Sequence, residues 1–315
     1  MAFIVMNIFL FFAIFIICFL NGYHRLLTKS KQTQEERICE QVIDSNRLYL
    51  LPSDYIIDSM DNDTLYHIFD KYVNSYQFRC CNVSRQGKRV GSGKYICADD
   101  RFKPSSPCLI YSFGSKFDFV FENAVWRSFK CEIHTFDPSL SFEESQIPYF
   151  VNFHLIGLSG NDFNQTKPEI WKHHNRPLRK VWGMQRLSTI QKVHSHKKKV
   201  IDILKIDIEG WEWDALPDIL QTGSLSNVKQ ICIEVHFGFS FKHIIKNNGK
   251  LSLKFTSNTW GNVSIKNQLK ILKRLYETGF RIFMYRTFNW GSLYIKGRKI
   301  SNLDELSLIN INFYK

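Results

Sequence analysis

The chain has 315 residues, of which 44% are hydrophobic and 15% aromatic, and it carries a formal net charge of +13. A chain this apolar is not disordered throughout, and its length allows one large domain with a smaller attachment. The positive charge would suit an anionic partner, but no nucleic-acid-binding module is present, so no nucleic acid is expected as a partner.

The first twenty residues are apolar and uncharged. Twenty residues at a rise of about 1.5 Å cross a hydrocarbon core of about 30 Å. The apolar run begins almost at Met1 and is followed by no small-x-small cleavage site, which favours an uncleaved transmembrane signal-anchor over residues 1–20. A cleaved and secreted form is the alternative. The polar residues 21–50 are predicted to form a stem.

Two sets of features disagree about which side of the membrane holds the body of the chain. Three basic residues between positions 25 and 31 would keep it in the cytosol by the positive-inside rule. Seven cysteines after residue 20 and four N-glycosylation sequons favour a lumenal or extracellular body instead. These sequons begin at Asn62, Asn82, Asn164 and Asn262. A body in the endoplasmic reticulum, the Golgi or the extracellular space is therefore expected.

Residues 51–107 are predicted to form a cysteine-containing cap that leads into the main domain. Within them, residues 61–78 begin with Asp and Asn and continue with apolar residues at helical spacing. Disulfides are expected, with the pairing left open, among Cys39, Cys80, Cys81, Cys97 and Cys108. Seven is an odd number, so at least one thiol should be free or paired between chains. No pair of CxxC elements suggests a zinc knuckle.

From Cys108 onward, strand-like runs alternate with helix-like segments. The runs are 108–114, 131–137, 153–159, 200–207 and 230–237, and the clearest helices are 116–129 and 264–280. This alternation predicts an α/β fold with a parallel sheet covered on both faces. Two later runs, 281–288 and 291–297, are predicted to form an antiparallel hairpin at the edge of the sheet.

Ligands of open α/β sheets bind beyond the carboxyl ends of the strands. Gly114 follows the first predicted strand and allows a tight turn, although a single glycine is usually only a turn. Asp137 ends the second strand, 23 residues later, where a carboxylate suits two ribose hydroxyls. The alternative for Asp137 is an ordinary turn before proline. Together the pair predicts a nucleoside-type cofactor.

The fourth strand ends in "LKIDIEGWEW", residues 204–213. If the strand continues to Glu209, Asp207 and Glu209 point to one face and are candidate catalytic carboxylates. Glu212 is explained by the first turn of the following helix. His236 ends the fifth strand and is a candidate general base, with a structural role as the alternative.

For two further motifs, a structural explanation is simpler than a functional one. Trp211 and Trp213 are two positions apart at a helix start, so at most one is expected to line a pocket. The basic segment 167–199 contains the histidine pairs 173–174 and 194–196. They are interpreted as incidental histidines in a basic loop, and no metal site is predicted.

Several motifs together resemble one known family. They are "YSFGSKFDFVFE", "CEIHTFDPS", "WGMQRLSTI", "DILKIDIEGWEW" and "IEVHF", in this order along the chain. They resemble the S-adenosylmethionine-dependent methyltransferase-like domain of the methyltransferase-like protein 24 family, and "LKIDIEGWE" is similar to a signature of FkbM-type methyltransferases. The resemblance extends over about residues 77–295.

The resemblance implies a class I methyltransferase fold: a Rossmann-like, seven-stranded sheet with a C-terminal antiparallel hairpin, here assigned to residues 108–315. It implies S-adenosylmethionine as the cofactor. Its glycine-loop role falls on Ser112, Phe113, Gly114 and Ser115, and its ribose-binding acid on Asp137. The chain has one glycine where the general class I pattern has three.

Three functions are weighed on these grounds. The first is a membrane-anchored methyltransferase whose methyl acceptor is unknown, with a glycan hydroxyl as one option. The second is a non-catalytic binding or scaffold protein of the same fold, which the missing glycines favour. The third is a lumenal glycosyltransferase, which ranks last because the DxD-like string at 61–63 lies outside the α/β region.

Overall fold

The computed structural model describes residues 49–89, 91–139, 141, 146–166, 179–236, 240–247, 250–256, 263–288, 293–295, 297–301 and 303–314. All of them belong to one compact unit, Ile43–Lys315. The predicted signal-anchor and almost all of the predicted stem lie outside these residues, as does the histidine pair at 173–174. Within the described ranges, no helix combines the length and apolar character needed to cross a membrane.

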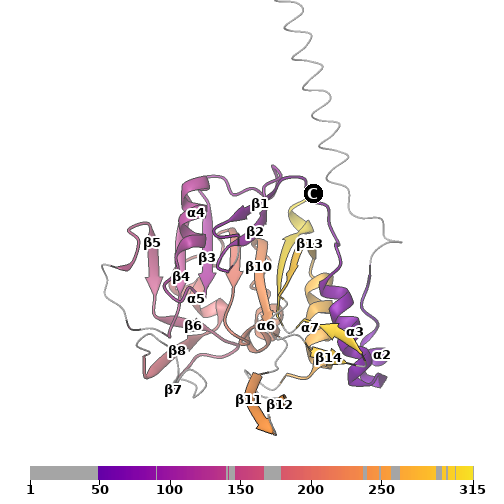
Figure 1. Cartoon of the computed structure of the whole chain (residues 1–315). Helices are drawn as coiled ribbons and strands as arrows, with labels where there is room; N and C mark the ends of the chain where they lie inside the picture. Colours follow the sequence, from indigo (N-terminus) through magenta and orange to yellow (C-terminus); the bar gives the residue numbers. More distant parts are fainter. Residues whose placement is uncertain are drawn as a thin grey trace, which may run out of the picture. The chain divides into compact units, whose positions relative to one another are not determined.

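The centre of the molecule is a seven-stranded mixed sheet (Figure 1). In spatial order its strands are β13 (Phe280–Thr287), β16 (Leu303–Asn310), β10 (Val228–His236), β9 (Ile201–Ile206), β3 (Leu109–Phe113), β4 (Glu132–Phe136) and β5 (Val151–His154). β16 runs antiparallel to both of its neighbours, and the strands from β10 to β5 run parallel. The α/β prediction is confirmed.

Two details of the predicted sheet are wrong. The partner of β13 is β16, whereas part of the run 291–297 forms β14 (Leu293–Ile295), which pairs with β15 (Arg298–Ile300). β16 escapes sequence analysis because acidic Asp304 and Glu305 interrupt its apolar pattern, although all eight of its residues are buried. The run 153–159 is divided between β5 and β6 (Ile156–Leu158), which pairs with a separate strand, β8 (Val181–Gln185).

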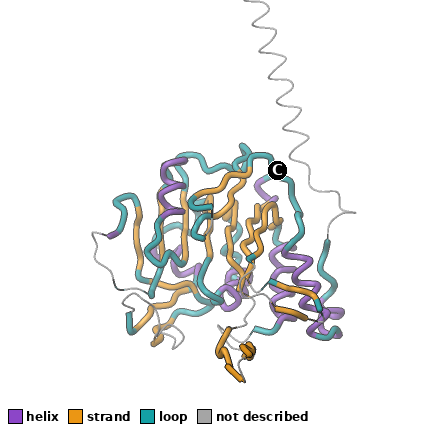
Figure 2. The backbone as a smooth tube through the Cα atoms, viewed as in Figure 1, coloured by secondary structure: helices purple, strands orange, loops and turns teal. Residues whose placement is uncertain are grey.

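Helices cover one face of the sheet, and one helix with a hairpin covers the other (Figure 2). The first face packs against α2 (Asp54–Ser59), α3 (Asn62–Val73), α5 (Leu187–Val193), α6 (Glu212–Gln221) and α7 (Ile265–Glu277). The second face packs against α4 (Val120–Phe129) and the hairpin of β1 (Val83–Gln86) and β2 (Lys94–Cys97). The predicted cap therefore contributes to both hydrophobic clusters.

The remaining described elements lie outside the central sheet and the helices that cover it. They are β7 (Phe163–Thr166), the hairpin of β11 (Ser240–Asn247) and β12 (Lys250–Thr256), and a 3₁₀ turn at Ile311–Phe313. β7 completes a three-stranded sheet with β6 and β8.

Two disulfides stabilise the second face. Cys80–Cys97 ties the segment before β1 to the end of β2, and Cys108–Cys131 joins the residues preceding β3 and β4. Cys81 is disulfide-bonded as well, and Cys232 is a buried free thiol. The expected free cysteine is thus present, but Cys131 was not among the cysteines expected to pair.

Candidate functional site

The register of the sheet places three predicted residues side by side. Phe113 of β3 pairs with Phe136 of β4 and with Ile206 of β9. Gly114, Asp137 and Asp207 are the next residues of these three strands, so they leave the sheet at the same edge. They line a cavity of about 350 Å³. Its wall comes from the residues after β3, β4 and β9, from Glu234 within β10, from β6 and β8, and from the tip of the β1–β2 hairpin.

Gly114 is required by a close approach between two backbones. Its φ is +79°, and a Cβ atom at this position would lie 1.7 Å from the carbonyl oxygen of Asp207. The turn continues through Lys116 and Phe117, which also have positive φ values of 51° and 57°. A non-glycine residue in this conformation is strained, and such strain is concentrated at functional sites.

Asp137 is 4% exposed, and its carboxylate organises the loop around it. Oδ2 accepts a hydrogen bond from the amide of Lys116 at 2.7 Å. Oδ1 accepts from the amide and the hydroxyl of Ser139 at 2.9 and 2.5 Å. These donors fill three of the about four acceptor positions of a carboxylate. Its predicted role as a ribose ligand stays a prediction, with one position on Oδ2 available for it.

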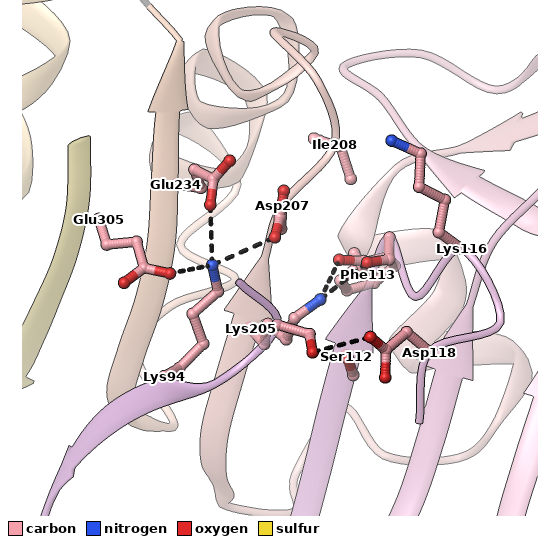
Figure 3. A network of polar contacts seen from close by, with 12 residues as sticks. Lys94, Ser112, Phe113, Lys116, Asp118, Lys205, Asp207, Ile208, Glu234 and Glu305 are labelled. Carbon is pink, nitrogen blue, oxygen red and sulfur yellow. Dashed lines mark hydrogen bonds and ion pairs between the residues drawn. The ribbon is translucent and has the colours of Figure 1, made fainter. Parts of the chain in front are cut away.

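A buried lysine occupies the centre of the polar network shown in Figure 3. Lys94, on β2, is 2% exposed, and its Nζ atom is surrounded by three carboxylates. They belong to Glu305 at 2.8 Å, Glu234 at 3.0 Å and Asp207 at 3.1 Å. Although burial opposes the charged form, these carboxylates raise the pKa of Lys94, so its ammonium group is a fixed positive charge beside the cavity.

A second buried lysine holds the turn that begins at Gly114 by hydrogen bonds to its backbone. Lys205 of β9 donates from Nζ to the carbonyl oxygens of Phe113 and Gly114 at 3.2 and 2.8 Å. It also lines the cavity. The turn is therefore held from two sides, by Lys205 and by Asp137.

Asp207 and Glu234 face the same ammonium group but have opposite pKa shifts. Burial opposes ionisation of Asp207, yet Lys94 and Lys205 hold its pKa below the ordinary 3.8. Burial and the neighbouring Asp207 raise the pKa of Glu234 well above the ordinary 4.5. Carboxylates whose pKa values are separated in this way are typical of acid–base sites.

Glu209 and His236 lie next to this pair. β9 ends at Ile206, and Glu209 is in a left-handed turn with φ +57°, so the strand does not continue to Glu209 as the sequence analysis had assumed. Glu209 still lines the cavity and pairs with Lys116 at 2.9 Å. His236 lies 3.3 Å from Glu212 and 3.6 Å from Glu234.

The charge state of His236 follows from its neighbours. Burial lowers its pKa, but the carboxylates of Glu212, Glu234 and Glu209 outweigh burial and raise the pKa to about 10. The ring therefore carries a proton at neutral pH, which suits an electrostatic role better than that of a base. Glu212 begins α6 as expected and also accepts a hydrogen bond from the amide of Ile208.

The other predicted residues are distributed around the site. Ser115 lines the cavity, whereas Ser112 and Phe113 lie beneath the turn. Ser112 is fully buried and donates to Glu122 of α4, and Phe113 stacks on Phe136 with ring centroids 4.6 Å apart. The tryptophan prediction is confirmed. Trp211 lines the cavity, and Trp213 is buried in the core, donating to the carbonyl oxygen of His236.

Sequence analysis missed Lys94 and Lys205 as site residues, and it noted Glu234 as an acidic residue at the end of the fifth predicted strand without giving it a role. A lysine at position 205 next to the apolar residues of a buried strand was an available signal, because buried lysines need acceptors. No such signal existed for Lys94, which meets Asp207 only through the tertiary fold.

Comparisons with known proteins show the family of the chain. A family model described as "Methyltransferase domain" matches residues 55–280. The human and rat proteins named "Probable methyltransferase-like protein 24" are each 22% identical over 239 residues, which is 72% of this chain. The match covers 59% and 60% of those proteins, so the chain spans about six-tenths of their length. No solved structure matches the chain significantly.

Proposed function

Because the chain belongs to the methyltransferase domain family, we propose that it transfers a methyl group from S-adenosylmethionine to a hydroxyl group. The observation that carries this proposal is the register of β3, β4 and β9, which brings Gly114, Asp137 and Asp207 to one cavity. The carboxyl edge of such a sheet is where α/β folds bind nucleoside cofactors. The similarity to the human and rat proteins named "Probable methyltransferase-like protein 24" supports methyl transfer as the reaction class and does not identify the acceptor.

The residues around the cavity fit this cofactor. Its volume of about 350 Å³ lies within the range of about 300–1,000 Å³ for ligand pockets. Gly114 lets backbone groups approach a ligand, and Asp137 keeps an acceptor position for a ribose hydroxyl. Phe136, Trp182 and Trp211 supply aromatic lining. When bound, S-adenosylmethionine supplies an electrophilic methyl group.

We assign the general base to Glu234. It lines the cavity, and its raised pKa brings it closer to neutral pH than an ordinary carboxylate, where a base is most effective. Its ionised form would take the proton of the acceptor hydroxyl while Lys94 holds the carboxylate in place at 3.0 Å. The predicted catalytic roles of Asp207, Glu209 and His236 remain proposals. Asp207 holds the ammonium group of Lys94 in an ion pair. The negative charge of Glu209 and the positive charge of His236 contribute to the electrostatic potential beside the cavity.

Glu234→Gln is expected to lower kcat by about 100-fold or more, the usual contribution of a general base. In the wild type the base works when deprotonated. Activity should therefore be high above the raised pKa of Glu234 and fall as the pH drops through it, at a pH above 4.5. The residual activity of the variant should not fall in this way as the pH drops. The measurement is transfer of labelled methyl groups to a panel of hydroxyl-bearing acceptors, glycans included, as a function of pH.

Glu305→Gln is the matched control, because Glu305 also binds Lys94 but does not line the cavity. The activity of Glu305→Gln should still fall at acidic pH, as that of the wild type does. Wild-type activity in Glu234→Gln would remove Glu234 from the mechanism. Cofactor binding without transfer to any acceptor would favour the alternative of a non-catalytic binding protein.

The location of the chain stays a proposal as well. We propose a membrane-anchored body on the lumenal or extracellular side. Two disulfides in the described residues support it, as does the exposure of Asn62, Asn82 and Asn164 at the starts of sequons. A glycosidase-sensitive mass shift of the cellular protein is the test, and its absence would count against the lumenal side. A glycosyltransferase activity gains no support, because Asp61 of the DxD-like string caps α3.

A further inference from the structure

Four of the ten histidines meet on the helix-covered face of the sheet, and none of the four lines the cavity. His134 lies on β4, His154 ends β5, and His194 and His196 follow α5. The rings of His134, His154 and His194 have centroids 4.5–5.1 Å apart. One ring nitrogen from each of these three residues lies within 4.8 Å of the other two.

The turn after α5 is built to present its histidines. The amide of His196 donates to the carbonyl of Gln191 at 2.7 Å, and the amide of Ser195 donates to that of Lys192 at 3.1 Å. This pair of bonds is the Schellman motif that ends many helices, with Ser195 in the left-handed position at φ +58°. Glycine is the usual residue there, so the serine holds a strained conformation between two histidines.

A carboxylate orients the central imidazole. His134 donates from Nε2 to Oε1 of Glu132 at 2.9 Å, which directs its Nδ1 atom toward Nε2 of His154, also at 2.9 Å. The other oxygen of Glu132 lies 3.4 Å from Lys199. In zinc sites, a histidine that binds the metal through one ring nitrogen usually donates from the other nitrogen to a carboxylate, as His134 does to Glu132.

We propose that His134, His154 and His194 bind one zinc ion, with Glu132 orienting His134 from behind. Neutral imidazoles are the ligands that zinc takes, and three of them leave a fourth, open position. Zn–N bonds of about 2.0–2.1 Å in tetrahedral geometry require ligand nitrogens about 3.3 Å apart. The present separations, 2.9 Å between Nδ1 of His134 and Nε2 of His154 and at most 4.8 Å for the other two pairs, bracket this distance.

Two of the proposed ligands can be reached from solvent. His154 and His194 are only partly buried, which leaves a path for the ion.

The position of the cluster connects it to the cavity through the backbone. β5 is the edge strand of the sheet, and among the described strands it pairs with β4 alone. The amide of Asp137 donates to the carbonyl oxygen of His154 at 3.0 Å. A zinc ion would clamp β4, β5 and the turn after α5, and would thereby stiffen the strand that supports Asp137.

The test is zinc uptake by the full chain, purified without a histidine tag and treated with a chelator. One equivalent of zinc is expected to bind, and cobalt in its place should give the visible absorption of tetrahedral cobalt. Glu132→Gln should weaken zinc binding by about 10–100-fold, as removal of a second-layer partner does. His194→Ala, which removes a ligand, should weaken it more.

His67→Ala, on α3, is the matched control and should bind like the wild type. The absence of stoichiometric uptake by the wild type would overturn the proposal without relying on any variant. So would equal affinity of His194→Ala and His67→Ala. His196 lies in a second group with Glu132 and His134. Loss of zinc in His196→Ala but not in His194→Ala would place the metal there and refute the present assignment.

Discussion

Lys94→Met is expected to lower the free energy of unfolding by about 3–5 kcal/mol, because it leaves buried carboxylates without their counter-ion. The Nζ atom of Lys94 lies within 3.1 Å of carboxylate oxygens from Asp207, Glu234 and Glu305. Methionine keeps most of the stem volume and removes only the charge. For a domain of this size the loss corresponds to a fall in Tm on the order of 10 °C, which thermal unfolding followed by circular dichroism measures.

The loss should depend on pH in a defined direction. In the wild type the pKa of Asp207 is depressed below 3.8, so its contribution to stability is present above that pH and is lost below it. In the variant the buried carboxylates lack the ammonium group that favours their charged forms, so the destabilisation is greatest when they are ionised. The difference in Tm between the two proteins should therefore narrow as the pH falls from about 7 to about 5.

Lys88→Met is the matched control on the same hairpin. Lys88 pairs with Asp118 at 3.0 Å, but its side chain is 56% exposed. Exposed pairs contribute about 0–1 kcal/mol. Equal Tm values for the two variants would show that Lys94 does not compensate the acidic cluster.

Gly114→Ala is expected to lower stability by about 3 kcal/mol or more and to abolish cofactor binding. The added methyl group would lie 1.7 Å from the carbonyl oxygen of Asp207, a backbone atom that no side-chain rotation can move. Relief requires β3 and β9 to separate at the point where Asp207 donates to Phe113. The φ of +79° adds about 1 kcal/mol of backbone strain.

Gly223→Ala isolates the second of these effects. Gly223 also has a positive φ, +66°, but nothing lies within 4 Å of an added Cβ. It should lose only about 1 kcal/mol. If chemical denaturation gives the two alanine variants the same stability, the close approach at Gly114 has no energetic consequence.

The local pattern of the sequence was sufficient to predict the edge of the sheet that carries the site. Apolar runs identified β3, β4, β9 and β10, and the carboxyl end of each run is where parallel strands place ligands. Gly114, Asp137 and Asp207 were found in this way, because each needs only its own strand to be placed. The helix 264–280 was found for a similar reason, with Ser264 as its N-cap and Gly279 at φ +108° after it.

The partners of those residues depend on contacts between distant segments. Lys94 is on a hairpin that was assigned to a separate cap, and nothing near it in sequence suggests three carboxylates. β16 was missed because Asp304 and Glu305 are acidic, and only the fold shows that they are buried. The histidine cluster combines two strands and a helix end. His194 and His196 therefore looked like part of a basic loop until His134 and His154 were placed beside them.

Titration of the purified chain with S-adenosylmethionine by calorimetry tests the central claim most directly. The site described above predicts saturable binding of one cofactor per chain. It also predicts that Asp137→Ala, which removes the ribose acceptor and the anchor of Lys116 and Ser139, loses this binding while Asp162→Ala, outside the cavity, retains it. No heat of binding by the folded wild-type protein at millimolar cofactor would contradict the proposed methyltransferase function.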